Sequence, residues 1–190
     1  MDILTAFGLS ASAGLNAYIP LLVVSLLAKF TDLLQLGDPW KALESWWTIG
    51  ILLILAGVEF FADKIPAVNH INDVVQTFIR PTAGAILFAA STSVVSDLQP
   101  VFALILGLFV AGSVHAVKVV SVRPAVTATT GGAANVPVSI AEDVVSTVLS
   151  ILAAVMPVIL ASLMVLLTAL LVWWIWRRIN AGRPRKTYRG

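Results

Sequence analysis

Four long stretches of this 190-residue chain contain no charged residue, and this feature constrains its fold most. The stretches are residues 3–28, 81–96, 98–114 and 151–176. An apolar helix of about 20 residues spans the hydrocarbon core of a bilayer. Charged residues make up only 12% of the chain, against about 25% in an ordinary soluble domain. We therefore predict an all-α, polytopic membrane helix bundle with a single transmembrane domain over residues 1–176.

Four segments are predicted to span the membrane completely, namely residues 46–61, 81–96, 98–114 and 151–176. The second and third form a helical hairpin around a polar turn at residues 96–100. The last span contains Pro157, which is expected to bend it, and ends in three tryptophans beside Arg177 and Arg178. Because six of the twelve basic residues follow this span, the positive-inside rule predicts a basic cytoplasmic tail over residues 177–190.

Two further segments, residues 3–28 and 124–141, do not read as ordinary spans. The first is apolar but contains Gly14, Asn16 and Pro20, and the second is uncharged but rich in threonine, glycine and asparagine. Membranes tolerate irregular backbone only where it is buried in protein or lines a water-filled cavity. We therefore predict two broken or re-entrant hairpins.

These two segments resemble each other in sequence. SASAG, which ends at Gly14, precedes Pro20 by the same interval as TATTG, which ends at Gly131, precedes Pro137. Three predicted spans separate the copies, so the second copy would be inverted, with the two tips meeting near the midplane as in transporters. The alternative is that small residues only allow close helix packing. The predicted tip residues are Ser12, Gly14, Asn16, Thr129, Gly131 and Asn135.

Ionisable side chains at or within a span are unfavourable in lipid and are therefore candidates for function. The candidate substrate- or ion-binding residues are Glu59, Asp63, Lys64, Asp73, Arg80, His115, Lys118, Arg123, Ser139, Glu142 and Asp143. Residues 72–80, which include Asp73 and Arg80, are predicted to form an amphipathic helix with its polar side chains on one face. This helix is expected on the membrane surface or over a cavity.

Each candidate group also has a structural interpretation. Asp73 and Arg80 could form an ion pair, and Lys118 could extend its ammonium to the interface. Ser139 and Glu142 have the spacing of a capping box at a helix start. His115 could serve a proton relay or be an ordinary packed histidine.

Several classes of activity are disfavoured. Without cysteine there are no disulfides, iron–sulfur clusters or cysteine zinc sites. The motifs of common hydrolases, metalloproteases and nucleotide-binding proteins are missing, and His70 and His115 make a poor metal set. We expect no cofactor, no metal and no catalytic residue. The basic tail favours anionic lipid over nucleic acid, and membrane lipids and a homo-oligomeric copy are the expected partners.

Four sequence blocks carry a family resemblance: EFFADKIP from Glu59, DVVQTFIRPTAG from Asp73, HAVKVVSVR from His115 and PVSIAED from Pro137. They resemble a small bacterial membrane family catalogued as domain of unknown function 4126. The resemblance implies that these charged clusters belong together, but it implies no activity. It also suggests a multi-pass protein of the bacterial inner membrane, for which we expect both termini in the cytoplasm.

Our first functional hypothesis is a small transporter or channel for a polar or anionic solute or a lipid headgroup, and its titratable residues would allow coupling to protons. One alternative is a membrane enzyme acting on lipid phosphates, in which Ser139, Glu142 and Arg123 would converge. Another is a structural or assembly protein without substrate.

Overall fold

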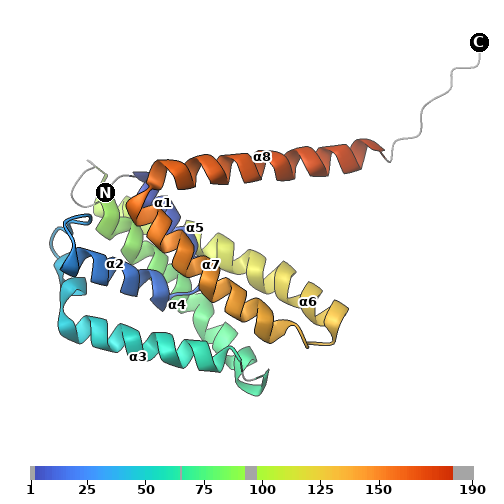
Figure 1. Cartoon of the computed structure of the whole chain (residues 1–190), viewed down its shortest axis with the longest axis horizontal. Coiled ribbons are helices and arrows are strands. Elements are labelled where there is room, and N and C mark those ends of the chain that lie inside the picture. Colours follow the sequence, from blue (N-terminus) through green and yellow to red (C-terminus); the bar gives the residue numbers. More distant parts are fainter. Residues whose placement is uncertain (1–2, 65, 93–97, 182–190) are drawn as a thin grey trace, which may run out of the picture.

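The computed structural model describes residues 3–64, 66–92 and 98–181, and in these residues the chain forms helices and no strands (Figure 1). In chain order the helices are α1 (Ile3–Leu15), α2 (Tyr18–Phe30), the short 3₁₀ turn η1 (Trp40–Glu44), α3 (Trp46–Ala62), α4 (Pro66–Thr92), α5 (Pro100–Val117), the π-helical turn η2 (Lys118–Val122), α6 (Arg123–Thr130), α7 (Asn135–Val155) and α8 (Pro157–Ala181). Residues 96–97 of the expected polar turn and residues 182–190 of the expected tail lie outside the described residues.

Four helical segments are long and apolar enough to cross a membrane: Asn72–Thr92, Pro100–Thr130, Asn135–Val155 and Pro157–Arg178. Helices α1, α2 and α3 are apolar but shorter. The prediction of an all-α membrane bundle is confirmed. Two predictions of individual spans are wrong. Helix α3, predicted to span the membrane, is one of the shorter helices, and α7, which was not predicted as a span, is long enough to cross.

The first broken segment is a helical hairpin that turns inside the bundle. Helices α1 and α2 have 13 residues each, about 20 Å of helix, and the chain breaks between them at Asn16. Oδ1 of Asn16 accepts hydrogen bonds from the amides of Tyr18 and Ile19, which begin α2. After α2 the chain turns back toward the N-terminal half of α1. There Trp40 packs against a cluster of buried apolar residues that includes Ala6 of α1.

The second segment differs from the predicted broken hairpin. Residues 124–141 contain the end of a continuous helical segment, Pro100–Thr130, a turn, and the first residues of α7. Gly131 ends α6 with a φ of 60°, a left-handed conformation that glycine adopts without strain. The threonines belong to the end of α6 and the two glycines begin the turn to α7, so the backbone is not broken within the bundle.

Residues 72–80 are not a separate surface helix, because they continue into the next apolar segment as one helix, α4, with Pro81 in its interior. Their polar face points into the protein: Gln76 is 2% exposed and Arg80 0% exposed. Their apolar face points outward, with Phe78 74% exposed. This inversion suits a helix in lipid, where the outside is apolar and polar groups must find partners inside.

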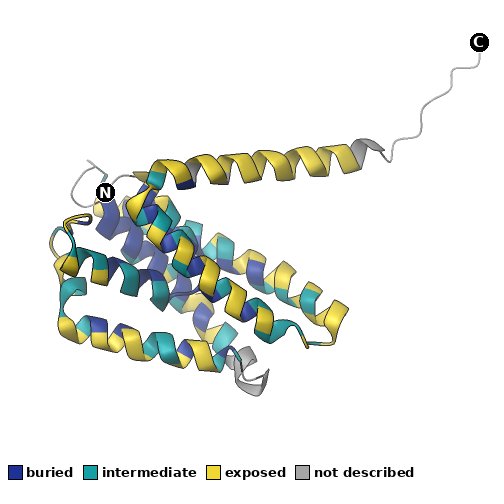
Figure 2. Ribbon diagram, viewed as in Figure 1, coloured by how far each residue is buried: buried dark blue, intermediate teal, exposed yellow. Residues whose placement is uncertain are grey.

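A proline divides the last predicted span. Helix α7 ends at Val155 and α8 begins at Pro157, so residues 151–155 belong to α7. Proline has no amide hydrogen and its ring clashes with the preceding turn, which ends the helix before it. Figure 2 shows α8 exposed along most of its length, as expected of an apolar helix that faces lipid.

Small residues bring α1, α4 and α5 into close contact at the core. A Cβ atom added to Gly84 of α4 would overlap Cβ of Ala111 in α5, and one added to Gly107 would lie 2.6 Å from Cβ of Phe88. Ser10 of α1 donates a hydrogen bond of 2.8 Å to the carbonyl of Gly84. These contacts align the polar residues of α4 and α5 beside the turn of the α1–α2 hairpin.

Candidate functional site

All the charged candidates identified from the sequence form ion pairs or hydrogen bonds inside the bundle. The ion pairs of five carboxylates and four cations fall into three groups: one around Asp63 and Arg80, one of Lys118 with Glu142, and one of Lys64 with Asp143. Hydrogen bonds add His115 and Ser139 to the first group. The members are Glu59, Asp63, Lys64, Asp73, Arg80, His115, Lys118, Arg123, Ser139, Glu142 and Asp143. We call this set the polar network.

The most buried part of the network is the pair of Glu59 and Arg80. Nη2 of Arg80 lies 2.8 Å from Oε1 of Glu59, and their side chains are 0% and 1% exposed. Glu59 comes from the last turn of α3, and Arg80 lies one residue before Pro81 in the middle of α4. A carboxylate and a guanidinium removed from water in this way require each other, since either charge alone would be strongly unfavourable.

Asp63 connects the two arginines. Its Oδ2 lies 3.7 Å from Arg80 and 3.5 Å from Arg123, and it accepts a hydrogen bond of 3.4 Å from Ser139. Its Oδ1 accepts a hydrogen bond of 2.6 Å from Asn72. Asp63 follows the last residue of α3 as its C-cap and is 3% exposed, so its carboxylate is held inside the protein.

Asp73 and Arg80 share a helix face but pair with different partners. Oδ2 of Asp73 lies 2.9 Å from Nη1 of Arg123, whereas Arg80 binds Glu59. Seven residues along α4 separate the two side chains by about 10 Å. Pairing is therefore decided by neighbouring helices, and the expected Asp73–Arg80 ion pair is not formed.

Lys118 and Glu142 form a second buried pair. Nζ of Lys118 lies 2.7 Å from Oε2 of Glu142 and donates a hydrogen bond of 3.3 Å to the carbonyl of Leu15. Lys118 is 2% exposed, so its ammonium is enclosed by protein at this end of the helix. The carbonyl of Leu15 lies at the C-terminal end of α1, where the helix dipole favours a cation.

The third pair joins Lys64 to Asp143 at 3.3 Å. Oδ1 of Asp143 also accepts a hydrogen bond of 3.0 Å from Asn16. Asn16 thus caps α2 through its oxygen and binds the network through its nitrogen. The break in the α1–α2 hairpin lies directly against the charged groups at two points, Leu15 and Asn16.

His115 lies beside Arg80 and is 3% exposed. Its Nδ1 lies 3.4 Å from Nη1 of Arg80, and its Nε2 lies 3.2 Å from the hydroxyl of Thr77. An imidazole next to a guanidinium is favoured in its neutral form, because a second positive charge there would be repelled.

The six predicted tip residues do not meet. Ser12 and Gly14 are buried in α1, whereas Thr129 and Gly131 are exposed at the α6–α7 turn. Asn135 exchanges hydrogen bonds with Thr127 at that turn. Asp143, which contacts Asn16, lies eight residues beyond Asn135, about 12 Å along α7. The structure therefore gives no support to the inverted repeat.

Helix α7 instead contributes a polar stripe that sequence reasoning recognised only in part. Ser139, Asp143, Ser146 and Ser150 are all buried on one face, at the spacing of four, three and four residues that defines a helix face. The Oγ of Ser12 lies 2.9 Å from Oγ of Ser146 and 2.7 Å from Oγ of Ser150. Ser139 lies inside α7, which begins at Asn135, so the capping box is wrong.

Three buried polar atoms near the centre have no hydrogen-bond partner among the described residues. They are Oε2 of Glu59, Oε1 of Gln76 and Nε of Arg80. Gln76 is not among the candidates selected by charge because its amide is uncharged, although it lies on the same buried polar face as Arg80. Atoms of this kind in a native site indicate a polar species such as water or an ion.

These features define a polytopic helical membrane protein with a buried network of ion pairs. The chain belongs to the family described as domain of unknown function DUF4126, whose sequence model matches residues 3–177. The comparisons with curated proteins and with solved structures returned no match.

Proposed function

We propose that this protein is a small membrane transporter in which the polar network forms the site for a polar or anionic solute and couples its movement to protons. The observation that carries the proposal is the contact of the broken α1–α2 hairpin with the network, through the carbonyl of Leu15 and the side chain of Asn16. Broken helices beside intramembrane charges are the usual construction of transporter sites.

The buried ion pairs support a functional reading over a purely structural one. Burying a carboxylate with a guanidinium seldom increases stability over apolar packing, because desolvation offsets the attraction. The network nevertheless contains nine charged groups, five acidic and four basic. One carboxylate is therefore in excess, and a bound proton or cation would balance it.

Three buried atoms without partners among the described residues offer contacts to a solute or to water. Oε2 of Glu59 and Nε of Arg80 belong to the most buried pair, and Oε1 of Gln76 lies one turn before Arg80 on α4. They offer two acceptors and one donor. A small polar molecule could bind these groups without breaking the ion pairs.

Uptake in proteoliposomes tests the proposal. Purified protein would be tested with radiolabelled phosphate, sulfate, acetate and glutamate under an imposed pH gradient. Glu59→Gln and Glu142→Gln should abolish any uptake that the parent shows, because each leaves a buried cation without its partner. The matched control is Asp32→Asn, at an exposed acidic residue outside the network, which should keep uptake. Full uptake in both network variants would remove the polar network from the mechanism.

We further propose a bacterial inner-membrane location with both termini in the cytoplasm. The basic residues Arg177 and Arg178 at the end of α8 support this orientation, and their guanidinium groups lie over Trp173 and Trp174 as at an interface. Fusion of green fluorescent protein or alkaline phosphatase to each terminus tests it, since the first fluoresces in the cytoplasm and the second is active outside.

One observation favours the lipid-phosphate enzyme as a second candidate. The hydroxyl of Ser139 contacts Asp63, which lies beside Arg80 and Arg123. A phosphate could bind these arginines, although Glu142 pairs with Lys118 instead of joining them. Release of phosphate from undecaprenyl pyrophosphate, lost in Ser139→Ala, would support this candidate over transport.

A further inference from the structure

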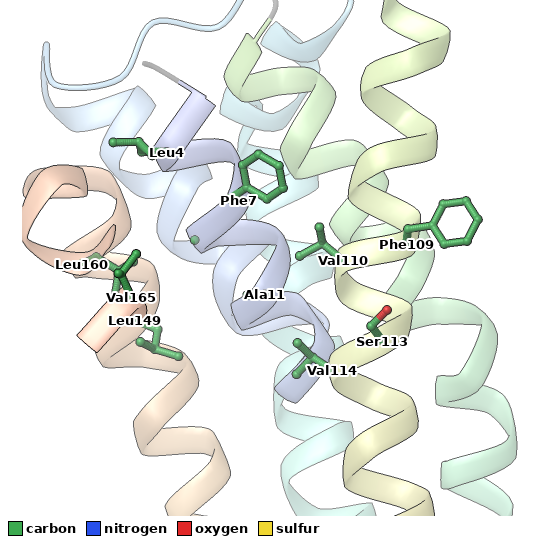
Figure 3. Close-up of a pocket in the computed structure, with 11 residues that line it drawn as sticks. Leu4, Phe7, Ala11, Phe109, Val110, Ser113, Val114, Leu149, Leu160 and Val165 are labelled. Atoms are coloured by element: carbon green, nitrogen blue, oxygen red, sulfur yellow. The ribbon is translucent and has the colours of Figure 1, made fainter. Parts of the chain in front are cut away.

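Two adjoining cavities form one groove along a face of the bundle. The first has a volume of about 570 Å³ and the second about 500 Å³, and Ser113 and Val114 of α5 line both. In Figure 3 Phe7 and Ala11 of α1 lie between Val110 and Val114 of α5 on one side and Leu149 of α7 on the other.

Helix α1 forms the floor of the groove with a single stripe of residues. Leu4, Gly8, Ala11 and Leu15 line the cavities at intervals of four, three and four, which places them on one helix face. Eleven residues of helix correspond to about 16 Å. The rest of the lining in the first cavity is apolar apart from the hydroxyl of Ser113, so the groove suits a hydrocarbon chain.

The groove ends at a pair of opposite charges. Lys118 and Glu142, whose charged atoms lie 2.7 Å apart, are both part of the wall of the second cavity. Lys118 lies 18 residues after Pro100, about 27 Å along the helix. With Pro100 at one edge of a hydrocarbon core about 30 Å thick, Lys118 lies close to the other edge, at the depth of lipid headgroups.

We propose that this groove binds one phospholipid with a zwitterionic aminophosphate headgroup, its acyl chain along the α1 stripe and its headgroup at Lys118 and Glu142. The phosphate lies toward the ammonium of Lys118, and the primary ammonium lies toward the carboxylate of Glu142. A neutral ion pair in apolar surroundings accepts a neutral headgroup with no charge left unbalanced.

Other headgroups fit less well. Phosphatidylglycerol could place its phosphate at Lys118, but it has no ammonium to offer the carboxylate of Glu142. The quaternary ammonium of phosphatidylcholine has no hydrogen to donate to Glu142. Charge-assisted hydrogen bonds are the strong ones, so phosphatidylethanolamine is expected to bind most tightly.

Native mass spectrometry of the full chain in detergent tests the proposal, with phosphatidylethanolamine, phosphatidylglycerol and phosphatidylcholine of identical acyl chains. The parent should retain one phosphatidylethanolamine about tenfold more tightly than either other lipid, the effect of one hydrogen bond to a charged group. Glu142→Gln should remove this preference while a lipid chain still binds. Equal binding of all three lipids, or a preference for phosphatidylglycerol in the parent, would overturn the proposal.

Variants that fill the groove test its location. Ala11→Phe places a ring on the floor, and Val145→Trp, at an exposed position in the wall of the second cavity, provides a variant that leaves the α1 packing intact. Both should lose the bound lipid, whereas Ala128→Phe, at an exposed site on α6 outside the groove, should retain it. Lipid retained by Val145→Trp would refute binding in this groove. The measurement is of lipid binding alone, so its outcome is independent of whether the protein transports a solute.

Discussion

Arg80 and Glu59 form an ion pair of 2.8 Å with no more than 1% of either side chain exposed, between the middle of one helix and the last turn of another. The pair binds α3 to α4 at the centre of the polar network. Its stability can be measured separately from any transport activity.

Replacing one member of this pair should destabilise the protein strongly. Glu59→Gln or Arg80→Gln alone is expected to lower the free energy of unfolding by about 3–5 kcal/mol, because a buried charge is left without its partner. The double variant should lose less than the sum of the two. Unfolding by sodium dodecyl sulfate in mixed micelles, followed by circular dichroism, measures all three.

The exposed pair Asp38 and Lys41, at 3.9 Å and with side chains 85% and 61% exposed, is the matched control. Lys41→Gln should change the free energy of unfolding by less than about 1 kcal/mol. If the losses of unfolding free energy in Glu59→Gln and Arg80→Gln added exactly in the double variant, the two residues would not depend on each other.

Gly84→Ala should lower stability by about 1–3 kcal/mol, because its methyl group would overlap Cβ of Ala111 and force α4 and α5 apart. Gly57→Ala in α3 is the control, since an added Cβ there has no neighbour within 4 Å among the described residues. Alanine is the better helix former by about 1 kcal/mol, so this control should be neutral or stabilising. Thermal unfolding in detergent compares the two, and equal effects would contradict the close approach.

Asn16→Ala should destabilise the hairpin by about 1–2 kcal/mol, because the amides of Tyr18 and Ile19 lose their cap. Asn16→Asp preserves an acceptor for those amides but places a second carboxylate beside Asp143. If the contact with Asp143 matters, the aspartate variant should be less stable than the parent despite the intact cap. Hydrogen exchange of α2 amides reports both effects, and an aspartate variant as protected as the parent would count against the contact.

Ser12→Ala should weaken the attachment of α1 to α7, where the serine hydroxyl meets Ser146 and Ser150. Hydrogen bonds between membrane helices contribute about 0.6 kcal/mol each on average, so a loss of about 1–2 kcal/mol is expected. Ser162→Ala in α8 removes an exposed hydroxyl that bonds only its own helix, to the carbonyl of Val158. Unfolding in mixed micelles should show little change for that control, and an equal loss in both variants would refute the cross-helix role.

Much of the architecture follows from the sequence. The uncharged runs predict helices in a membrane because only helices satisfy every backbone group without water. The break near Asn16 is predicted by the glycine, asparagine and proline of the first apolar run. The charged candidates could be selected because ionisable groups are rarely kept near lipid without a role, and the structure places each of them in an ion pair or a hydrogen bond of the polar network.

The predictions from sequence were wrong where contacts between distant segments of the chain decide the structure. Residues 72–80 were expected to form a helix on the membrane surface or over a cavity. Their polar face instead points into the protein, because Phe78 and its apolar neighbours are better placed in lipid. The segment near Gly131 shares small residues, an asparagine and a proline with the true break near Gly14, and these shared residues do not distinguish an exposed turn from a buried one.

The sequence by itself determined the membrane character of the protein, its helices and the identity of its charged residues, because hydrophobicity and chain propensity act over short distances. The tertiary structure alone decided which charges pair. Arg80 binds Glu59 and Arg123 binds Asp73, because packing of α3, α4 and the π-helical turn sets those distances. The same packing leaves the groove between α5 and α7, where Lys118 and Glu142 meet the apolar floor of α1.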